Sequence, residues 1–132
     1  MLTRIPLLIV PLLVVNLGLF GLIGGATPFA GTVFSVQMVS GGTWTMTWAD
    51  MIVLMALLLL FVEIMKSTRS GTSSIIDHLL STVVFVLYLV EFLMVAGAAT
   101  SLFFTLMVIA LVDVLAGFSV SIRTAGRDIN FG

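Results

Sequence analysis

The feature that most constrains this chain is a mostly apolar run of 48 residues, 75–122, that contains no proline. A single helix of that length would be about 72 Å long, whereas the hydrocarbon core of a bilayer is about 30 Å thick. The run therefore has to fold back on itself. The small residues at 96–101, AGAATS, mark the turn and divide the run into predicted spans at 75–96 and 101–122.

Two further apolar stretches, at about 5–24 and 48–66, reach the roughly 20 residues that a membrane-crossing helix needs. In the first stretch, Pro6 falls in the opening turn, and Pro11 is expected to kink the helix because proline lacks a backbone N–H. This stretch is longer than the roughly 7 to 15 apolar residues of a signal peptide. We therefore expect it to remain as the first span.

Capping-box patterns precede the second and third spans. In Thr47-x-x-Asp50 and again in Ser74-x-x-Asp77, a hydroxyl and a carboxylate are spaced to bind N–H groups that the first helical turn leaves free. The patterns predict that Asp50 and Asp77 are helix caps.

The composition fits these spans, because 61% of the residues are hydrophobic and only 8% are charged, against roughly 25% charged residues in soluble domains. We predict an all-α integral membrane protein whose single domain, 1–132, is a bundle of four transmembrane helices with an extracytoplasmic β-hairpin between the first two. The lipid bilayer is its first partner. A net charge of -1 and the lack of a basic run exclude nucleic acid as a partner.

Catalysis and metal binding find little support in the sequence. Cysteine is absent, which excludes disulfides, iron-sulfur ligation and thiol chemistry, and the single histidine, His78, argues against a zinc site. No glycine-framed serine accompanies that histidine. We predict that the protein is not an enzyme and holds no metal or other cofactor.

The basic residues indicate how the chain is oriented. All five fall at the N-terminus, between the second and third spans, or after the fourth span, and these five are Arg4, Lys66, Arg69, Arg123 and Arg127. By the positive-inside rule, both termini are expected to be cytoplasmic. The pattern suits a bacterial inner membrane.

The segment between the first two spans carries the alternation of a half-buried strand, VFSVQMVSGGTWTMTW at 33–48, and predicts a β-hairpin at about 33–47. A three-residue loop, 40–42, would place a glycine at the left-handed position. That register pairs Phe34 with Trp48, Val36 with Met46 and Met38 with Trp44, so one face is wholly apolar. The opposite face would pair Ser35 with Thr47 and Gln37 with Thr45.

An isolated two-stranded ribbon is marginal in water, so the apolar face needs a support. The ribbon can cap its own bundle, rest on the outer headgroup boundary, or contact another protein, including a neighbouring copy. The residues of this predicted interaction surface are Phe34, Val36, Met38, Trp44, Met46 and Trp48, the last of which can instead begin the following helix.

Polar groups within the spans are candidate functional residues, because a charge near the bilayer centre costs roughly 2.5 to 3.5 kcal/mol. They could form a proton or cation relay in which neutral carboxyls exchange protons with a substrate. The relay candidates are Glu91, Asp113, Asn16 and Tyr88, with His78 and Glu63 as weaker candidates near the cytoplasmic end.

The structural alternative, which we favour, is that the intramembrane carboxyls are protonated and join helices by hydrogen bonds. Glu63 and Lys66, three residues apart, are expected to form a local ion pair. The remaining charges, Arg123, Arg127 and Asp128, are expected to lie in a solvated tail.

Two functions remain open. In the favoured one, the protein is an oligomeric assembly or accessory subunit that packs through its helix faces and its outer hairpin, in a homo-oligomer or a larger membrane complex. The alternative is a small proton- or cation-coupled transporter or channel subunit. The outline is similar to that of claudin-like junction proteins, but the cysteine pair and the tryptophan-glycine-leucine-tryptophan signature of that family are missing, so no residue roles are carried over.

Overall fold

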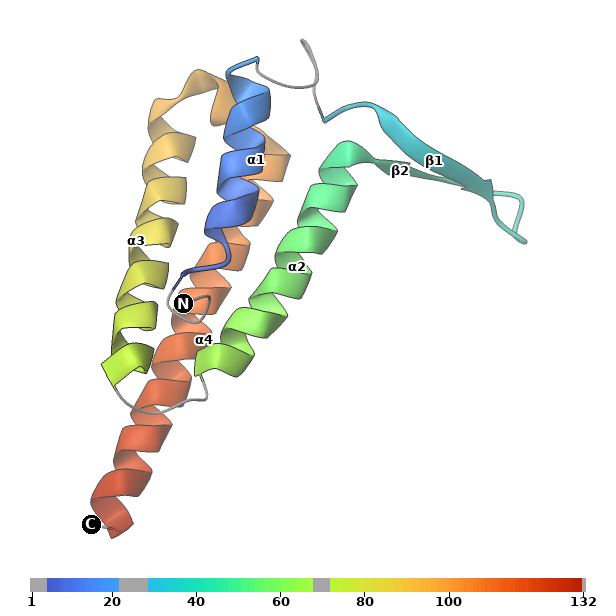
Figure 1. Cartoon of the computed structure of the whole chain (residues 1–132). Coiled ribbons are helices and arrows are strands. Elements are labelled where there is room, and N and C mark those ends of the chain that lie inside the picture. Colours follow the sequence, from blue (N-terminus) through green and yellow to red (C-terminus); the bar gives the residue numbers. More distant parts are fainter. Residues whose placement is uncertain (1–4, 22–28, 68–71, 132) are drawn as a thin grey trace.

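The structure is a computed structural model that describes residues 5–21, 29–67 and 72–131 (Figure 1). These residues form four α-helices, one short 3₁₀ turn and one hairpin. In chain order the elements are α1 (Ile9–Leu19), β1 (Thr32–Gln37), β2 (Thr43–Thr47), α2 (Trp48–Ser67), α3 (Thr72–Met94), η2 (Ala96–Ala98) and α4 (Ser101–Phe131).

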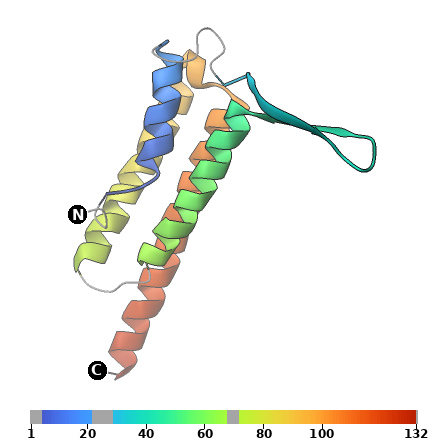
Figure 2. The same cartoon turned by 45° about the vertical axis from the view of Figure 1, so that its right-hand side comes forward.

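The helices lie side by side, with α4 packed most extensively against α3 and α2. Two views show that the hairpin extends sideways from one end of the bundle, where the turn between α3 and α4 also lies (Figures 1 and 2). The end of α2, the start of α3 and the C-terminal part of α4 lie at the opposite end. Aromatic and aliphatic side chains of α1, α3 and α4 fill the interior, with Tyr88, Phe103 and Leu106 almost completely buried.

Three helices have the length and apolarity to cross a membrane, over Trp48–Ser67, Ile75–Met94 and Ser101–Val120. They coincide with three of the four stretches that the sequence predicts. The turn predicted at 96–101 is confirmed, since η2 joins α3 to α4 there. Many large apolar side chains on the outer faces of these helices are exposed, as lipid-facing residues would be.

The capping box at the start of α2 is confirmed in both of its halves. The N–H of Thr47 donates to the Asp50 carboxylate at 3.1 Å, and the N–H of Asp50 donates to the Thr47 hydroxyl at 3.2 Å. The N–H of Trp48, the first residue of α2, donates to the carbonyl of Gly31 at 3.1 Å. Trp48 therefore belongs to the helix, and the Gly31 carbonyl, just before β1, binds its otherwise free N–H.

The corresponding prediction for α3 is wrong. This helix begins at Thr72, so Asp77 lies in its second turn, and its carboxylate faces Lys66 of α2 instead of a free backbone N–H. The Ser74 side chain lies outside the described part of the chain. A buried ammonium attracts the Asp77 carboxylate more strongly than a helix end would.

Helix α4 is longer than its predicted span. It contains 31 residues, which corresponds to about 46 Å, and continues to Phe131 beyond the predicted end at 122. Bilayer thickness limits a span but does not limit a helix, and no proline follows to stop this one. Arg123, Arg127 and Asp128 therefore lie on helical backbone, and their side chains are outside the described part of the chain.

Helix α1 is shorter than the predicted 5–24. It has 11 residues, Ile9–Leu19, and Gly21 follows it with a φ of 76°. Pro11 is its third residue and does not kink the helix, because an N–H in the first turn has no acceptor within the helix. The residues before Ile9 are instead not α-helical, and positions 22–24 lie outside the described residues.

The hairpin has the predicted strands and the predicted loop length, but a different register. Its pairs are Phe34 with Met46, Ser35 with Thr45, Val36 with Trp44 and Gln37 with Thr43, which contradicts the predicted partners. The Met38 N–H donates to the Gly42 carbonyl at 2.7 Å, so the three-residue loop is 39–41. A glycine takes the left-handed position, as predicted, and it is Gly41, with a φ of 92°.

This difference shifts every pair by two residues, and an even shift keeps each side chain on its face of the ribbon. The predicted separation of apolar and polar side chains onto opposite faces of the hairpin is therefore confirmed. Phe34 and Trp44 share the apolar face, with ring centroids 5.1 Å apart and edge-on geometry. Ser35 and Thr45 share the other face, where their hydroxyls lie 3.2 Å apart.

The loop conformation can be tested with two glycines that are adjacent in sequence. Gly41→Ala is expected to destabilise the hairpin by about 1 to 2 kcal/mol, because its φ is positive although a new Cβ would meet no atom within 4 Å. Gly42→Ala, whose Cβ would make ordinary contact with Ser40, is the control. Hydrogen exchange of the strand amides measures both, and equal protection in the two variants would contradict this loop geometry.

Candidate functional site

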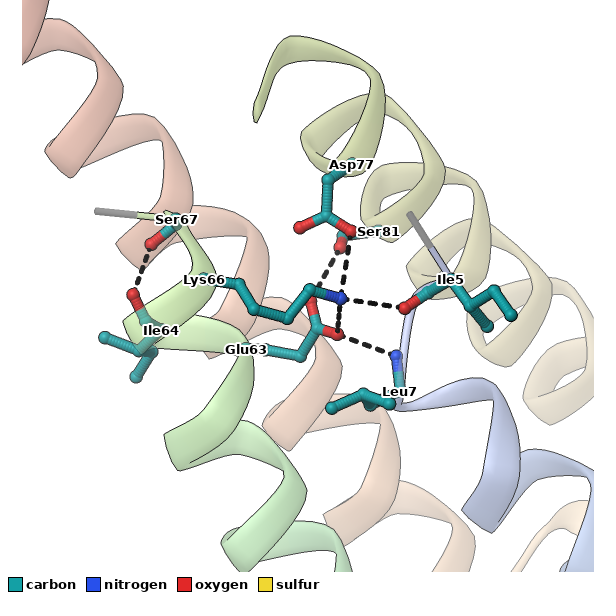
Figure 3. A network of polar contacts seen from close by, with 8 residues as sticks. All are labelled: Ile5, Leu7, Glu63, Ile64, Lys66, Ser67, Asp77 and Ser81. Carbon is teal, nitrogen blue, oxygen red and sulfur yellow. Dashed lines mark hydrogen bonds and ion pairs between the residues drawn. The ribbon is translucent and has the colours of Figure 1, made fainter. Parts of the chain in front are cut away.

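Buried polar side chains gather where α2, α3, α4 and the segment before α1 meet. Figure 3 shows most of this group, at the end of the bundle away from the hairpin. We call it the polar cluster, and its members are Glu63 and Lys66 of α2, Asp77 and Ser81 of α3, and Asp113 of α4.

Glu63 is the centre of the polar cluster and is 1% exposed. Its carboxylate accepts three hydrogen bonds, from the Leu7 N–H at 2.7 Å, the Lys66 ammonium at 3.0 Å and the Ser81 hydroxyl at 3.5 Å. The local pair between Glu63 and Lys66 that the sequence predicts is thereby confirmed. Because its donors come from three parts of the chain, Glu63 ties α2 to α3 and to the residues before α1.

Lys66 has two further partners. Its Nζ lies 3.3 Å from the Asp77 carboxylate and donates to the Ile5 carbonyl at 2.9 Å (Figure 3). One ammonium is thus placed between two carboxylates and a backbone oxygen. Ion pairs this deeply buried remain favourable only when hydrogen bonds satisfy their remaining lone pairs and protons, as they do here for Glu63.

Asp113 adds a third carboxyl to the polar cluster. It is 6% exposed and lies near Ser81, and the carboxyls of Glu63 and Asp77 act on it electrostatically. Among the described residues of the polar cluster, three carboxyls thus accompany the one ammonium of Lys66, and two of them pair with it directly.

The polar cluster also has a structural task. Non-helical backbone inside an apolar bundle needs partners for its N–H and carbonyl groups. Lys66 binds the carbonyl of Ile5, Glu63 binds the N–H of Leu7, and the Tyr88 hydroxyl donates to the carbonyl of Leu8 at 2.8 Å. Side chains of α2 and α3 thus replace the hydrogen bonds that this segment would have made as a helix.

Glu91 lies apart from the polar cluster, nearer the end of α3 that leads into the turn. It lies near Asn16 of α1, whose amide donates to the Leu12 carbonyl at 2.8 Å. One carboxyl oxygen of Glu91, Oε2, is buried and has no hydrogen-bond partner among the described residues.

The structure does not bring the four relay candidates into one chain of polar contacts. Asp113 lies with Glu63, and Glu91 lies with Asn16. The stripe of α3 between Ser81 and Glu91 carries Val84 and Tyr88, both buried in the apolar core. Tyr88 is 1% exposed, and its hydroxyl donates a hydrogen bond to the carbonyl of Leu8. The relay remains a prediction.

His78 faces α4 rather than the polar cluster. Its ring meets that of Phe118 edge-on at 3.9 Å between centroids, and a Cβ added to Gly117 would lie 2.5 Å from its Nδ1. Glycine at 117 is therefore required for this close helix contact. Among the described residues, no three His, Cys, Asp or Glu side chains are arranged to hold a metal ion.

Sequence reasoning missed Ser81 as a partner of Glu63 and Asp77 as a partner of Lys66. A signal was available, because Asp77 and Ser81 are four residues apart and share one helix face. The connection between α2 and α3 is short, so the end of one helix and the start of the next must lie close together. That consideration places Lys66 beside Asp77.

The hairpin is the second candidate site. Met46 is buried against the bundle, whereas the other members of the apolar face are 39 to 51% exposed. Those exposed residues are Phe34, Val36, Met38, Trp44 and Trp48. Comparison with protein-family models, with curated proteins and with solved structures gives no match to this chain. Its function is therefore argued from these two sites.

The structural role of Glu63 can be tested by substitution. Glu63→Ala removes three hydrogen bonds and leaves the Leu7 N–H buried without its acceptor, so we expect a loss of about 3 kcal/mol in unfolding free energy. Glu91→Ala, at a carboxyl with fewer partners, is the control and is expected to cost about 1 kcal/mol. Unfolding in mixed detergent micelles measures both, and equal losses would refute the assignment.

Proposed function

We propose that this protein crosses the membrane four times and acts as a subunit that assembles with other membrane-embedded chains. The single observation that supports this function is the hairpin, whose apolar face is largely uncovered by its own bundle. Assembly gives that face the support that a two-stranded ribbon needs.

The fourth crossing in this proposal is a broken helix. The 11 residues of α1 account for about 16 Å, about half of the roughly 30 Å of a bilayer core. The residues before it continue the chain as a turn, with Leu8 at φ -71° and ψ -5°. Non-helical backbone at membrane depth is tolerated when protein covers it and satisfies it, and Glu63, Lys66 and Tyr88 supply these contacts.

The same arrangement supports an orientation with both termini in the cytoplasm. Lys66 lies in the last turn of α2, and Arg123 and Arg127 follow the membrane-length part of α4, at the end of the molecule opposite the hairpin. Basic residues favour the cytoplasmic side, and a bacterial inner membrane fits this pattern. The hairpin then lies on the outer side.

The helix faces supply fewer docking surfaces than the sequence suggests. One side of α4 carries the small residues Ala110 and Gly117, but it packs within the chain: Ala110 is buried and Gly117 lies against His78. The outer face of α2 exposes bulky residues such as Leu58 and Phe61, which suit lipid as well as protein. The hairpin therefore carries the proposal.

A paired substitution on the hairpin tests the proposed assembly. Val36→Ser with Trp44→Ser changes two cross-strand partners on the apolar face, both 45% exposed, so the bundle is expected to fold while the complex dissociates at least tenfold more readily. Ser35→Ala with Thr45→Ala changes the matched pair on the opposite face and serves as the control. Light scattering after extraction in mild detergent reports the size of the complex.

Unchanged size in the Val36/Trp44 variant, with the control also unchanged, would contradict assembly through the hairpin. Dissociation of both variants would indicate damage to the ribbon itself and would equally contradict a specific role for its apolar face.

One observation favours a second candidate, a proton- or cation-coupled transporter or channel subunit: the excess of carboxyls over ammonium groups in the polar cluster. Against it, Val84 and Tyr88 separate that cluster from Glu91 with packed side chains. We therefore keep it as the alternative to the assembly function.

Reconstituted vesicles distinguish the two candidates. For an assembly subunit, we expect proton flux no higher than in protein-free vesicles, with the same result for Asp113→Asn and Glu91→Gln. A pH-dependent flux that Asp113→Asn abolishes would favour the transporter, because that residue is the carboxyl in excess of the paired ones.

A further inference from the structure

The loop at the tip of the hairpin presents apolar side chains that no described residue covers. Val39, in the three-residue loop, is fully exposed, and the neighbouring Met38 is half exposed. Both views show the tip far from the helices, at the end of a ribbon that extends sideways (Figures 1 and 2). Exposed apolar side chains on such a protrusion are typical of contact sites.

At the root of the same hairpin lies an open apolar groove with a volume of about 440 Å³. The groove separates the apolar face of β2 from the first turns of α2 and reaches α4. Its lining residues are Trp44, Met46, Asp50, Val53, Leu54 and Thr105.

The two polar side chains of the groove already form hydrogen bonds with backbone groups of the same chain. The Asp50 carboxylate accepts the Thr47 N–H, and the Thr105 hydroxyl donates to the Ser101 carbonyl at 2.8 Å. No Lys or Arg lines the groove to attract a phosphate. An uncharged, apolar occupant therefore fits the groove better than a lipid headgroup or a charged peptide does.

We propose that the groove receives the hairpin tip of a second copy of this chain, so that Val39 and Met38 of one copy pack against Trp44 and Leu54 of the next. This inference rests on the proposed assembly function and names its partner. Tip and groove belong to the same end of the molecule, and copies in a bilayer share one orientation. A sideways hairpin therefore brings the tip of one copy to the level of its neighbour's groove.

The contact joins two different surfaces, so it is heterologous and repeats from copy to copy. Each chain offers one tip and one groove, and neither surface can satisfy the other within one chain because the ribbon holds them apart. The expected product is a ring or a row in the membrane plane, not an isolated two-fold dimer.

Cysteine cross-linking tests the contact directly, because the chain contains no cysteine of its own. In the double variant Val39→Cys with Leu54→Cys, mild oxidation of intact membranes is expected to give a ladder of dimers, trimers and larger species. The control pairs Val39→Cys with Phe61→Cys, a residue exposed on the same helix but two turns further from the hairpin. It is expected to give at least tenfold less product.

Each outcome has a defined meaning. A native-size complex without a ladder overturns the tip-to-groove contact, leaves the assembly function standing, and assigns the groove to another apolar occupant such as a lipid acyl chain. The absence of any complex overturns both proposals. Equal ladders in the two cysteine pairs would show random collision and would overturn the contact.

A charge at the tip provides a second test that does not depend on folding, because the Val39 side chain is fully exposed among the described residues. Val39→Asp would place a carboxylate in the apolar groove, and we expect it to weaken assembly at least tenfold, whereas Val39→Leu is expected to retain assembly. Equal complex size for the two variants in mild detergent would overturn the contact.

Discussion

The hydrogen bonds from Glu63 to the backbone of Leu7 and to Lys66 are the interaction on which the rest of the bundle depends. The chain before α1 is not helical, and unpaired backbone groups in an apolar interior would each cost several kcal/mol. A carboxylate on α2 can meet them only when α2, α3 and the N-terminal segment lie together. One buried acidic residue thereby fixes three elements, and its ammonium partner keeps the Asp77 carboxylate with them.

Local patterns predicted most of the architecture. Apolar run lengths gave α2, α3 and α4, and the Thr47 and Asp50 pattern gave a complete cap, because both depend only on neighbouring residues. Apart from Lys66, the partners of Glu63 could not be predicted in this way, since Leu7 and Ser81 come from two segments distant in the sequence. The hairpin register depended on which glycine takes the positive φ, and Gly41 and Gly42 are equivalent by composition.

The polar and apolar sites divide the molecule between two tasks. Inside the bundle, the side chains of the polar cluster bind one another, and Gly117 packs against His78, so these residues are not exposed for contacts with other chains. Outside, the hairpin keeps its apolar face and its tip uncovered. The proposed assembly function draws on this contrast between polar groups bound largely within the bundle and an amphipathic ribbon left uncovered.

The junction between hairpin and bundle has a mechanical consequence. Strand β2 ends at Thr47 and α2 begins at Trp48, so no flexible linker separates them. The cap at Asp50 stiffens this joint. A force applied to the ribbon is therefore transmitted along the axis of α2 to its far end, where Glu63 and Lys66 lie. The curvature of any assembly is then set by the angle of this joint.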